Sequence, residues 1–531
     1  MKQFVVTASE MKRYDTNTIE KYQMPSLLLM ERAALVTAEE LEQACGGKPC
    51  KVLVMAGCGN NGGDGLAVGR LLMLKGYEVT CVLLGSEDRC TQETKRQVCI
   101  LREYGVQIYS TIQDGEYDIV IDAIFGVGLS RPVEGICRNA IEWINKSRSY
   151  VCSVDIPSGI RTDSGEVMGC AVQANLTVTY GFRKLGHILY PGTGYTGRLV
   201  CRQMGIDERS FLGEMPLWFT HEGTDSIVLP ARRPDGNKGT FGKALLIVGS
   251  EKTAGAAMMA AKSAFRIGTG MVKVVTASEN REALMQYVPE TMLLAYSDDV
   301  FMKDSGASEE ETAFIGELRA AETWADCILV GPGIGTDRRA LELLRFSILE
   351  SSLPLVIDAD GLNILAEDKV LQETLADCGR RGRTVILTPH LGEFARLYGC
   401  SVTQVKEHLT EYPIELGEKL QCTVICKDAR TVVVCPGTLP GYINTTGNAG
   451  MATAGSGDVL AGMVTGLLAQ KMAGFDAAVA GVYLHGIAGD LAAKRESEIS
   501  MTATDIIDRI KDVVVMQRER QSRKERRINH D

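Results

Sequence analysis

Short apolar segments alternate with helical segments along most of this chain, and this alternation constrains the fold more than any other feature. Helical stretches between strands are typical of α/β domains built on parallel sheets. The length of 531 residues exceeds what one hydrophobic core usually fills, which favours two domains. The predicted strands include 51–56, 77–84, 117–121, 150–154, 243–249, 327–331, 355–358, 384–388, 423–427 and 431–434.

An irregular stretch, residues 216–238, separates the two series of strands. It contains three prolines and an Arg232-Arg233 pair, with little helical periodicity. We therefore expect a first domain over residues 1–220 and a second over residues 225–515. Residues 516–531 are rich in charge and are expected to form a solvated tail.

Composition excludes several classes of protein. The chain has 57 basic and 67 acidic residues, so its net charge of 57 − 67 = −10 argues against a chain-wide nucleic-acid-binding surface. We find no apolar segment long enough to span a membrane and no signal peptide. The 16 cysteines are scattered without a CxxC motif, which argues against a zinc site and is typical of a cytoplasmic protein.

The first glycine-rich segment, GCGNNGGDG (57–65), lies between a predicted strand and a predicted helix. Consecutive glycines allow backbone amides to face an anion. The segment also matches the GxGxxG pattern of dinucleotide-binding sites. Such a site needs an acidic residue about 20 residues later to bind the ribose, and this chain lacks it. An NAD-dependent dehydrogenase is therefore disfavoured.

Two further predicted strands end in polar segments, DAIFGVG (122–128) and DIPSG (155–159). The carboxyl ends of parallel strands converge on one crevice. Oxygen atoms of Asn61, Asp122 and Ser158 could then hold a hard cation. The alternative is that the aspartates only cap loops and helices.

Together with LLLMERAA (27–34), the segments AGCGNNGGDG (56–65), DAIFGVG and DIPSG resemble the NAD(P)H-hydrate epimerase domain over residues 1–215. The resemblance implies a Rossmann-like three-layer α/β/α fold that interconverts the R and S forms of hydrated NADH or NADPH at C6. It implies potassium at Asn61, Asp122 and Ser158, and we expect Asp155 to be the acid or base. The implied substrate-binding residues are Asn60, Asn61, Gly62, Gly63, Asp64, Gly126, Val127, Gly128, Leu129, Ser130, Arg131, Pro132 and Asp155.

The second glycine-rich segment, AGSGDVLAG (454–462), leads into a predicted helix. The amides of Gly455, Ser456 and Gly457 can bind a phosphoryl group at the positive end of that helix. Asp458 in the first turn can take a proton from a hydroxyl group as the phosphoryl group arrives. An acid near a helix N-terminus is common by itself, and GxxxxGK[ST] is absent, which excludes the P-loop class.

This segment stands with four others: GSEKTAGAA (249–257), GPGIG (331–335), DADGLN (358–363) and TPHLGE (388–393). Together they resemble the ribokinase-like fold and, within it, the ADP-dependent NAD(P)H-hydrate dehydratase, over residues 225–510. The resemblance implies that Ala256, Gly335, His390 and Asp458 contact the hydrate. It implies nucleotide contacts from Lys427, Asp428, Ala429, Arg430, Thr431 and Gly457, with Mg²⁺ bridging the phosphates.

Two positions depart from that family pattern. The nucleotide segment reads KDART (427–431) where KGAxT is expected, so Asp428 places a carboxylate near phosphates. Asn237 stands where the family often has histidine.

We expect a bifunctional repair enzyme that epimerises the hydrates and dehydrates the S form to NAD(P)H, converting ADP to AMP and phosphate. Its expected partners are hydrated NADH or NADPH and ADP, without nucleic acid or membrane, and we expect a homo-oligomer. The alternative is a small-molecule kinase of the ribokinase superfamily, acting on a vitamin-precursor alcohol, fused to a non-catalytic nucleotide-binding module.

Overall fold

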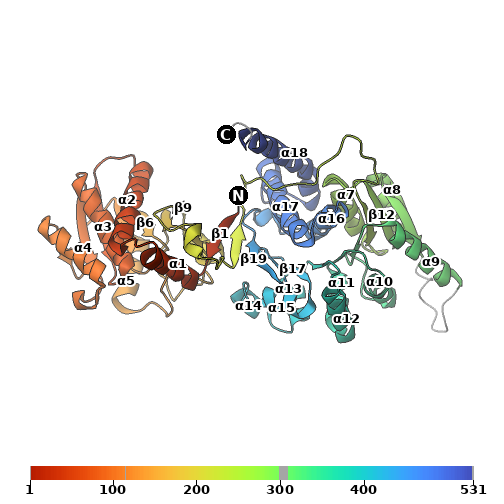
Figure 1. Ribbon diagram of the computed structural model, residues 1–531, viewed down its shortest axis with the longest axis horizontal. Helices are drawn as coiled ribbons and strands as arrows, with labels where there is room; N and C mark the ends of the chain where they lie inside the picture. Colours follow the sequence, from red (N-terminus) through yellow and green to blue (C-terminus); the bar gives the residue numbers. More distant parts are fainter. Residues whose placement is uncertain (1, 114, 298–308, 529–531) are drawn as a thin grey trace. The chain divides into compact units, whose positions relative to one another are not determined.

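The computed structural model describes residues 2–113, 115–297 and 309–528. The chain divides into two compact units, Gln3–Phe219, coloured red to yellow in Figure 1, and the residues from Thr220 onward, coloured yellow to blue, which Lys2 joins. Each unit has helices packed on a largely parallel sheet. The predicted two-domain α/β class is therefore confirmed.

The first unit is built on a seven-stranded parallel sheet in the order β4-β3-β2-β5-β6-β7-β9. Its strands are β2 (Lys51–Ala56), β3 (Glu78–Leu83), β4 (Ile108–Tyr109), β5 (Ile119–Ala123), β6 (Tyr150–Val154), β7 (Leu176–Tyr180) and β9 (Arg198–Arg202). Its helices are α1 (Ala8–Lys21), α2 (Ser26–Cys45), α3 (Asn60–Leu74), α4 (Gln92–Glu103), α5 (Gly135–Lys146) and α6 (Leu185–Ile188). Two short strands, β1 (Gln3–Val6) and β8 (Arg183–Lys184), pair in parallel, and β10 (Trp218–Thr220) spans the unit boundary.

Both faces of this sheet are covered. Val52 and Val54 pack into a core with residues of α2, α3 and α4, whereas Leu53 and Met55 pack into a second core with residues of α5. Neighbouring residues of a strand point to opposite faces, so β2 contributes to both cores. The result is the three-layer arrangement that we predicted. The strand order reverses between β2 and β5, which opens a crevice at their carboxyl ends.

Nine strands of the second unit follow the order β13-β12-β11-β14-β15-β16-β17-β18-β19. The first seven are parallel, and β18 and β19 are antiparallel to their neighbours. The strands are β11 (Lys243–Ile247), β12 (Met271–Ala277), β13 (Met292–Tyr296), β14 (Cys327–Val330), β15 (Leu355–Ile357), β16 (Val385–Leu387), β17 (Thr423–Cys426), β18 (Val432–Cys435) and β19 (Thr438–Ile443).

Helices connect these strands and extend beyond them. They are α7 (Ala254–Arg266), α8 (Arg281–Tyr287), α9 (Glu309–Trp324), α10 (Arg338–Leu349), α11 (Asp360–Glu367), α12 (Lys369–Arg380), α13 (Leu391–Tyr398), α14 (Val402–Glu407), α15 (Tyr412–Leu420), α16 (Ser456–Ala469), α17 (Gly474–Glu496) and α18 (Ala503–Ile528). Helix α16 packs against α7 and α17 and is buried along most of its length. Its N-terminus is thereby held at the carboxyl ends of the strands.

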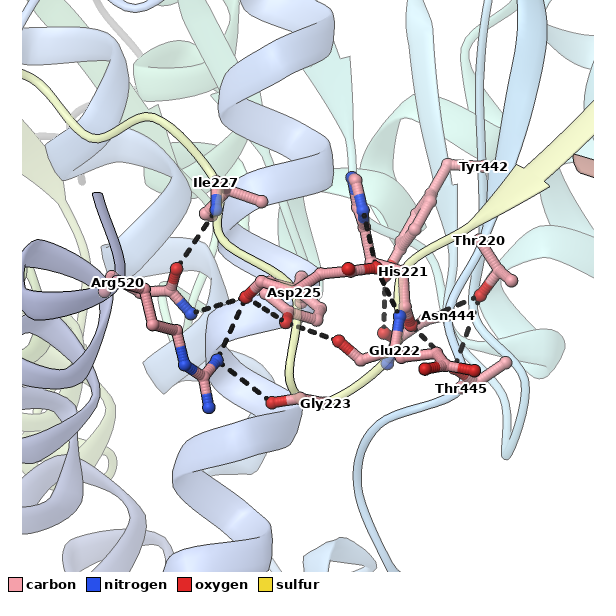
Figure 2. A network of polar contacts seen from close by, with 12 residues as sticks. Thr220, His221, Glu222, Gly223, Asp225, Ile227, Tyr442, Asn444, Thr445 and Arg520 are labelled. Carbon is pink, nitrogen blue, oxygen red and sulfur yellow. Dashed lines mark hydrogen bonds and ion pairs between the residues drawn. The ribbon is translucent and has the colours of Figure 1, made fainter. Parts of the chain in front are cut away.

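Polar contacts fix the segment that follows the unit boundary to the second unit (Figure 2). The Tyr483 hydroxyl lies 2.6 and 2.8 Å from the carbonyl oxygens of Glu222 and Asp225, and its single proton is shared between them. Arg520 donates to the carbonyl oxygens of Gly223 and Asp225, at 3.1 and 3.0 Å. Residues 222–225 are therefore an ordered part of the second unit.

The C-terminal segment differs from our expectation of a solvated tail from residue 516. Residues 516–528 continue α18, and residues 529–531 lie outside the described part of the chain. The helix extends because Gln517 is buried and its side chain accepts a hydrogen bond from the Ile227 amide at 3.0 Å. Among the described helices, none is long and apolar enough to cross a membrane.

Candidate active sites

A cavity of about 980 Å³ lies at the carboxyl ends of β2, β5 and β6 in the first unit. Its volume suits a small-molecule ligand. Most of the residues predicted to bind substrate line it, whereas Gly62, Gly63 and Pro132 are not among its lining residues. The predicted residues in the lining are Asn60, Asn61, Asp64, Gly126, Val127, Gly128, Leu129, Ser130, Arg131 and Asp155.

The structure gives Gly62 and Gly63 a packing role. Their amides donate to the Gly59 carbonyl oxygen at 2.9 and 3.3 Å, inside the first turn of α3. A Cβ atom at position 62 would lie 1.9 Å from the Gly57 carbonyl oxygen. The absence of a side chain therefore allows α3 to begin against the end of β2, and these two amides do not face an anion.

Replacing Gly62 by alanine is expected to destabilise the first unit by about 3 kcal/mol. The new methyl group would overlap the backbone of Gly57, which must shift to make room for it. Gly59→Ala is the matched control, since a Cβ at position 59 has no atom within 4 Å among the described residues. Chemical denaturation followed by near-UV circular dichroism measures both. Equal stability of the two variants would contradict the packing role.

Asp155 follows β6 in a left-handed backbone conformation, with φ of 65°, and its side chain is 14% exposed. Its Oδ1 atom accepts hydrogen bonds from Lys184 Nζ at 2.5 Å and Thr179 Oγ1 at 2.9 Å. Burial by itself would raise the pKa of Asp155, but Lys184, His187 and Thr179 lower it below its ordinary value. Asp155 is therefore an ionised carboxylate in the cavity wall.

Asp64, in the wall of the same cavity, has the opposite character. Burial, followed by the charges of Asp155 and Asp15, raises the pKa of Asp64 well above its ordinary value. One cavity thus holds one carboxyl group whose pKa is lowered beside a cation and another whose pKa is raised by burial. Such separation of pKa values is typical of acid–base sites.

The residues proposed for potassium meet around the loop that follows β5. Asp122 is completely buried, and its Oδ2 atom accepts from Ser153 Oγ at 2.7 Å and the Ser158 amide at 2.9 Å. Ser158 Oγ accepts from the Phe125 amide at 2.8 Å, and Asn61 lies against Gly126 of the same loop. Burial raises the pKa of Asp122, and its hydrogen-bond partners among the described residues are neutral groups.

The Nδ2 atom of Asn61 is buried without a hydrogen-bond partner in the described part of the chain, and only the Oδ1 atom of this side chain could ligate a cation. These oxygen donors around an uncompensated carboxylate fit a hard monovalent cation. No cluster of three or more His, Cys, Asp or Glu side chains that could hold a metal is found in the described residues. A potassium site with a single carboxylate is compatible with that finding.

In the second unit, a buried ion pair lies at the ends of β15 and β17. Lys427 Nζ donates to Asp358 Oδ1 at 2.7 Å, and Thr388 Oγ1 donates to the same oxygen at 2.7 Å. Asp358 is 1% exposed and Lys427 is 18% exposed. Burial alone would lower the pKa of Lys427, but Asp358, Glu393 and Asp458 raise it above its ordinary value.

Asp458, the predicted base, lies beside this pair in the first turn of α16. Burial, then the negative charge of Asp358, raises the pKa of Asp458 to about 7. A Cβ atom at Gly457 would lie 3.3 Å from Lys427 Nζ, so the ammonium group reaches the start of α16. A carboxyl group with this pKa can accept a proton from an alcohol near neutral pH.

The other residues predicted to contact the hydrate lie on neighbouring loops. A Cβ atom at Gly333 would lie 3.0 Å from the Cβ of Ala256, and the Gly335 amide donates to Asp360 Oδ2 at 2.9 Å. His390 caps α13, where its Nδ1 atom accepts from the Gly392 amide at 2.9 Å. His390 Nε2 therefore carries the proton of the neutral ring, since Nδ1 is an acceptor.

The predicted nucleotide-binding residues occupy the connection between β17 and β18. Asp428 and Ala429 are exposed, and Thr431 Oγ1 donates to the Asp428 carbonyl oxygen at 3.1 Å. Lys427 opens this connection and contacts the start of α16, so the segment lies next to Asp458. The exposed Asp428 carboxylate can reach solvent, which reduces its repulsion of phosphates.

Our reading of the sequence missed several residues of both sites. It assigned no role to Lys184, Thr179 or His187, and it did not pair Asp358 with Lys427. The run GFRKLGH (181–187) follows a strand end, as the other site motifs do, and this position was the available signal.

Two family models match this chain. The model described as NAD(P)H-hydrate dehydratase matches residues 244–512, and the model described as the YjeF-related protein N-terminus matches residues 26–186. Each lies within one of the two compact units. The two resemblances predicted from the motifs, including the ribokinase-like second domain, are confirmed.

Curated relatives match both halves together. A bifunctional NAD(P)H-hydrate repair enzyme of Thermofilum pendens is 36% identical over 95% of each chain. The enzyme of that name from Moorella thermoacetica is 33% identical, again over 95% of each chain. A crystal structure of an ADP/ATP-dependent NAD(P)H-hydrate dehydratase from Bacillus subtilis, co-crystallised with ATP and Mg²⁺, is 28% identical over 54% of this chain and 94% of its own, with a TM-score of 0.45.

Proposed function

This chain belongs to the family of bifunctional NAD(P)H-hydrate repair enzymes, and on that premise we propose how its two sites divide the work. The first unit interconverts the R and S hydrates of NADH and NADPH at C6. The second unit removes water from the S hydrate at the expense of ADP. The observation that supports this assignment is that each unit places one aspartate, Asp155 or Asp458, beside a lysine at the carboxyl ends of its strands.

For epimerisation, Asp155 acts as the base on the C6 hydroxyl group. C6 carries both that hydroxyl and the ring nitrogen N1. When Asp155 takes the hydroxyl proton, a C=O bond forms and the C6–N1 bond opens, with its electron pair moving to N1. Rotation and closure on the opposite face of C6 return the proton and invert the centre. The ionised state of Asp155 suits this role.

Potassium fits the first unit at Asn61, Asp122 and Ser158. It would balance the buried Asp122 carboxylate and order the loops that carry Gly126 and Ser158. This is an electrostatic and structural contribution, because the residues that line the cavity perform the proton transfer.

For dehydration, Asp458 takes the proton of the C6 hydroxyl as that oxygen attacks the terminal phosphoryl group of ADP. The products are AMP and a C6 phosphate ester. Loss of phosphate from C6 and of a proton from C5 then restores the C5=C6 double bond, because phosphate is a far better leaving group than hydroxide. The Ser456 amide donates to the Thr453 carbonyl oxygen at 3.3 Å, so the amides of Gly455 and Gly457 are the expected donors to the transferring group.

The nucleotide side of this site is formed by Lys427, Asp428, Ala429, Arg430, Thr431 and Gly457. Ala256, Gly335 and His390 form the hydrate side. Mg²⁺ would be held mainly by the nucleotide phosphates, with the carboxylates near Lys427 beside it, and would neutralise charge on the transferring phosphoryl group. Asp358, Asp360, Glu393 and Asp458 place negative charge near Lys427, but they form no metal-binding cluster among the described residues, so the phosphates would supply most ligands.

The function is tested by supplying purified R hydrate with ADP or ATP, in potassium or sodium buffer, and following absorbance at 340 nm. We expect NADH to form with ADP in potassium at a rate far above spontaneous epimerisation, because both sites act in sequence. Asp155→Asn should slow this coupled reaction at least 100-fold while leaving dehydration of purified S hydrate unchanged.

Three results would revise the proposal. A stable phosphate ester in place of free NADH would indicate the alternative small-molecule kinase. Turnover of R hydrate only at the spontaneous rate would indicate that the first unit is a non-catalytic binding module. Equal rates in sodium and potassium would remove the potassium assignment.

A further inference from the structure

Lys184 is the most deeply buried cation associated with the epimerase cavity. Its side chain is 1% exposed, and it belongs to β8, which pairs with β1. Nζ donates three hydrogen bonds: to Asp155 Oδ1 at 2.5 Å, to Thr179 Oγ1 at 2.7 Å and to the Tyr180 carbonyl oxygen at 3.2 Å. An ammonium group has three protons, so every donor of Lys184 is used.

The same contacts make the two oxygens of Asp155 unequal. Lys184 and Thr179 both donate to Oδ1, whereas Oδ2 receives no hydrogen bond from any described residue. Asp155 itself lines the cavity. One oxygen is therefore held by the protein, and the other is available to a ligand.

His187 fixes the backbone of the same aspartate. The Lys184 amide donates to His187 Nδ1 at 3.1 Å, and His187 Nε2 lies 2.9 Å from the Asp155 carbonyl oxygen. With Nδ1 as acceptor, Nε2 carries the proton and donates to that oxygen. Burial, then the charge of Lys184, lowers the pKa of His187 to about 3, so the ring stays neutral. This bond holds Asp155 in its left-handed conformation.

We propose that Lys184, supported by Thr179 and His187, is the positioning residue of the epimerase site: it binds Oδ1 of Asp155 and leaves Oδ2 as the atom that takes the proton of the C6 hydroxyl. This inference rests on the proposed role of Asp155 as the base. Lys184 is part of the cavity wall, but protein acceptors use all three of its donors, so we expect it to act through Asp155.

The pKa of Asp64 indicates how Asp155 would titrate without Lys184. Both carboxyl groups line one cavity, but burial, followed by the negative charges of Asp155 and Asp15, raises the pKa of Asp64. The titratable and charged groups around Asp155 are Lys184, His187, Asp64, Asp15 and Tyr180, and Lys12, Glu93 and Arg131 line the same cavity. Lys184 is the cation that is hydrogen-bonded to Asp155, so its removal should raise the pKa of Asp155, as burial and neighbouring carboxylates raise that of Asp64.

The test is the pH profile of kcat/KM for epimerisation in the full-length Lys184→Met variant. Epimerisation of purified S hydrate to R hydrate is followed by chromatography without ADP, and the rate of Asp155→Asn at each pH is subtracted as background. We expect the acidic limb of the profile to move upward by about 1–3 pH units, because Asp155 loses the cation that keeps it ionised. Activity should recover to within about tenfold of wild type above that limb.

Dehydration of S hydrate by the second unit of the same chain reports the amount of active protein. If Lys184→Met does not fold, the Thr179→Val variant tests the proposal instead. It removes one hydrogen-bond donor to Asp155 Oδ1, so we expect the acidic limb to move in the same direction by a smaller amount. In a double variant with Asp155→Asn, Lys184→Met should cause no further loss, because it acts through Asp155.

An unchanged acidic limb in the variant that folds would overturn the positioning role, as would an equal loss at every pH. A different result tests the premise: if Asp155→Asn epimerises as fast as wild type, Asp155 is not the base. The two failures are therefore distinguishable.

Discussion

Asp458→Asn is expected to lower kcat for dehydration about 1,000-fold while leaving epimerisation unchanged. Asparagine has nearly the same size as aspartate, but it cannot accept the proton of the C6 hydroxyl at the moment of phosphoryl transfer. The first unit of the same chain serves as an internal control for folding and concentration. The measurement is NADH formation from purified S hydrate and ADP, with epimerisation followed separately.

We expect the rate of dehydration by the wild-type enzyme to depend on the ionisation of Asp458. Because Asp458 must be ionised to act as a base and its pKa is about 7, kcat/KM for dehydration should rise as the pH increases through about 7 and then level off. The residual activity of Asp458→Asn should lack this limb.

Asp476→Asn is the matched control, since Asp476 is also an acid in the first turn of a helix, at the start of α17, and is exposed. It should retain wild-type dehydration. If Asp458→Asn keeps more than a tenth of the wild-type kcat, Asp458 is not the base.

Lys427→Met is expected to destabilise the second unit by about 3–5 kcal/mol, because it leaves the Asp358 carboxylate buried without its cation. The double variant Lys427→Met with Asp358→Leu should recover most of that loss, since no unpaired charge then remains. Differential scanning calorimetry of the full chain would follow the unfolding transition of the second unit. That transition is identified as the one that ADP shifts to higher temperature. Both variants should lose dehydration, because Lys427 belongs to the nucleotide side of the site.

Lys471 provides the control for this prediction. It forms an ion pair with Asp326 at 2.5 Å, but its side chain is 69% exposed. Lys471→Met should change stability by less than about 1 kcal/mol, as is usual for exposed pairs. A similar loss in Lys427→Met and Lys471→Met would mean that burial does not set the strength of the inner pair.

The order of strands and motifs could be predicted because each depends on neighbouring residues. The apolar segments at 51–56 and 150–154 form β2 and β6 with the predicted bounds. Strands β7 (Leu176–Tyr180) and β9 (Arg198–Arg202) were not among the predicted strands, although β7 is buried inside the sheet. Strand β9 lies at the edge of the sheet, where its residues are half-buried or exposed and two are arginines. Edge strands lack the continuous apolar pattern that marks inner strands.

The role of individual glycines also depended on the tertiary structure. The sequence placed Gly62 and Gly63 in an anion-binding turn, and their spacing is compatible with that function. In the folded chain these residues lie in α3, and the carbonyl oxygen of Gly57 occupies the space that a side chain at position 62 would need. Glycines that allow a helix to pack closely on a strand and glycines that form an anion-binding loop have the same pattern in a single sequence. The sequence therefore does not distinguish the two roles.

The sequence by itself determined the α/β class, the two-domain order, the family and the aspartates that we assign to catalysis, Asp155 and Asp458. These follow from local patterns, since a strand followed by a glycine-rich turn is encoded in consecutive residues. Only the tertiary structure decided which charges meet. Asp155 pairs with Lys184, 29 residues later, and Asp358 pairs with Lys427, 69 residues later. Parallel strands bring these distant residues to one edge of a sheet, and burial there makes each partner control the charge of the other.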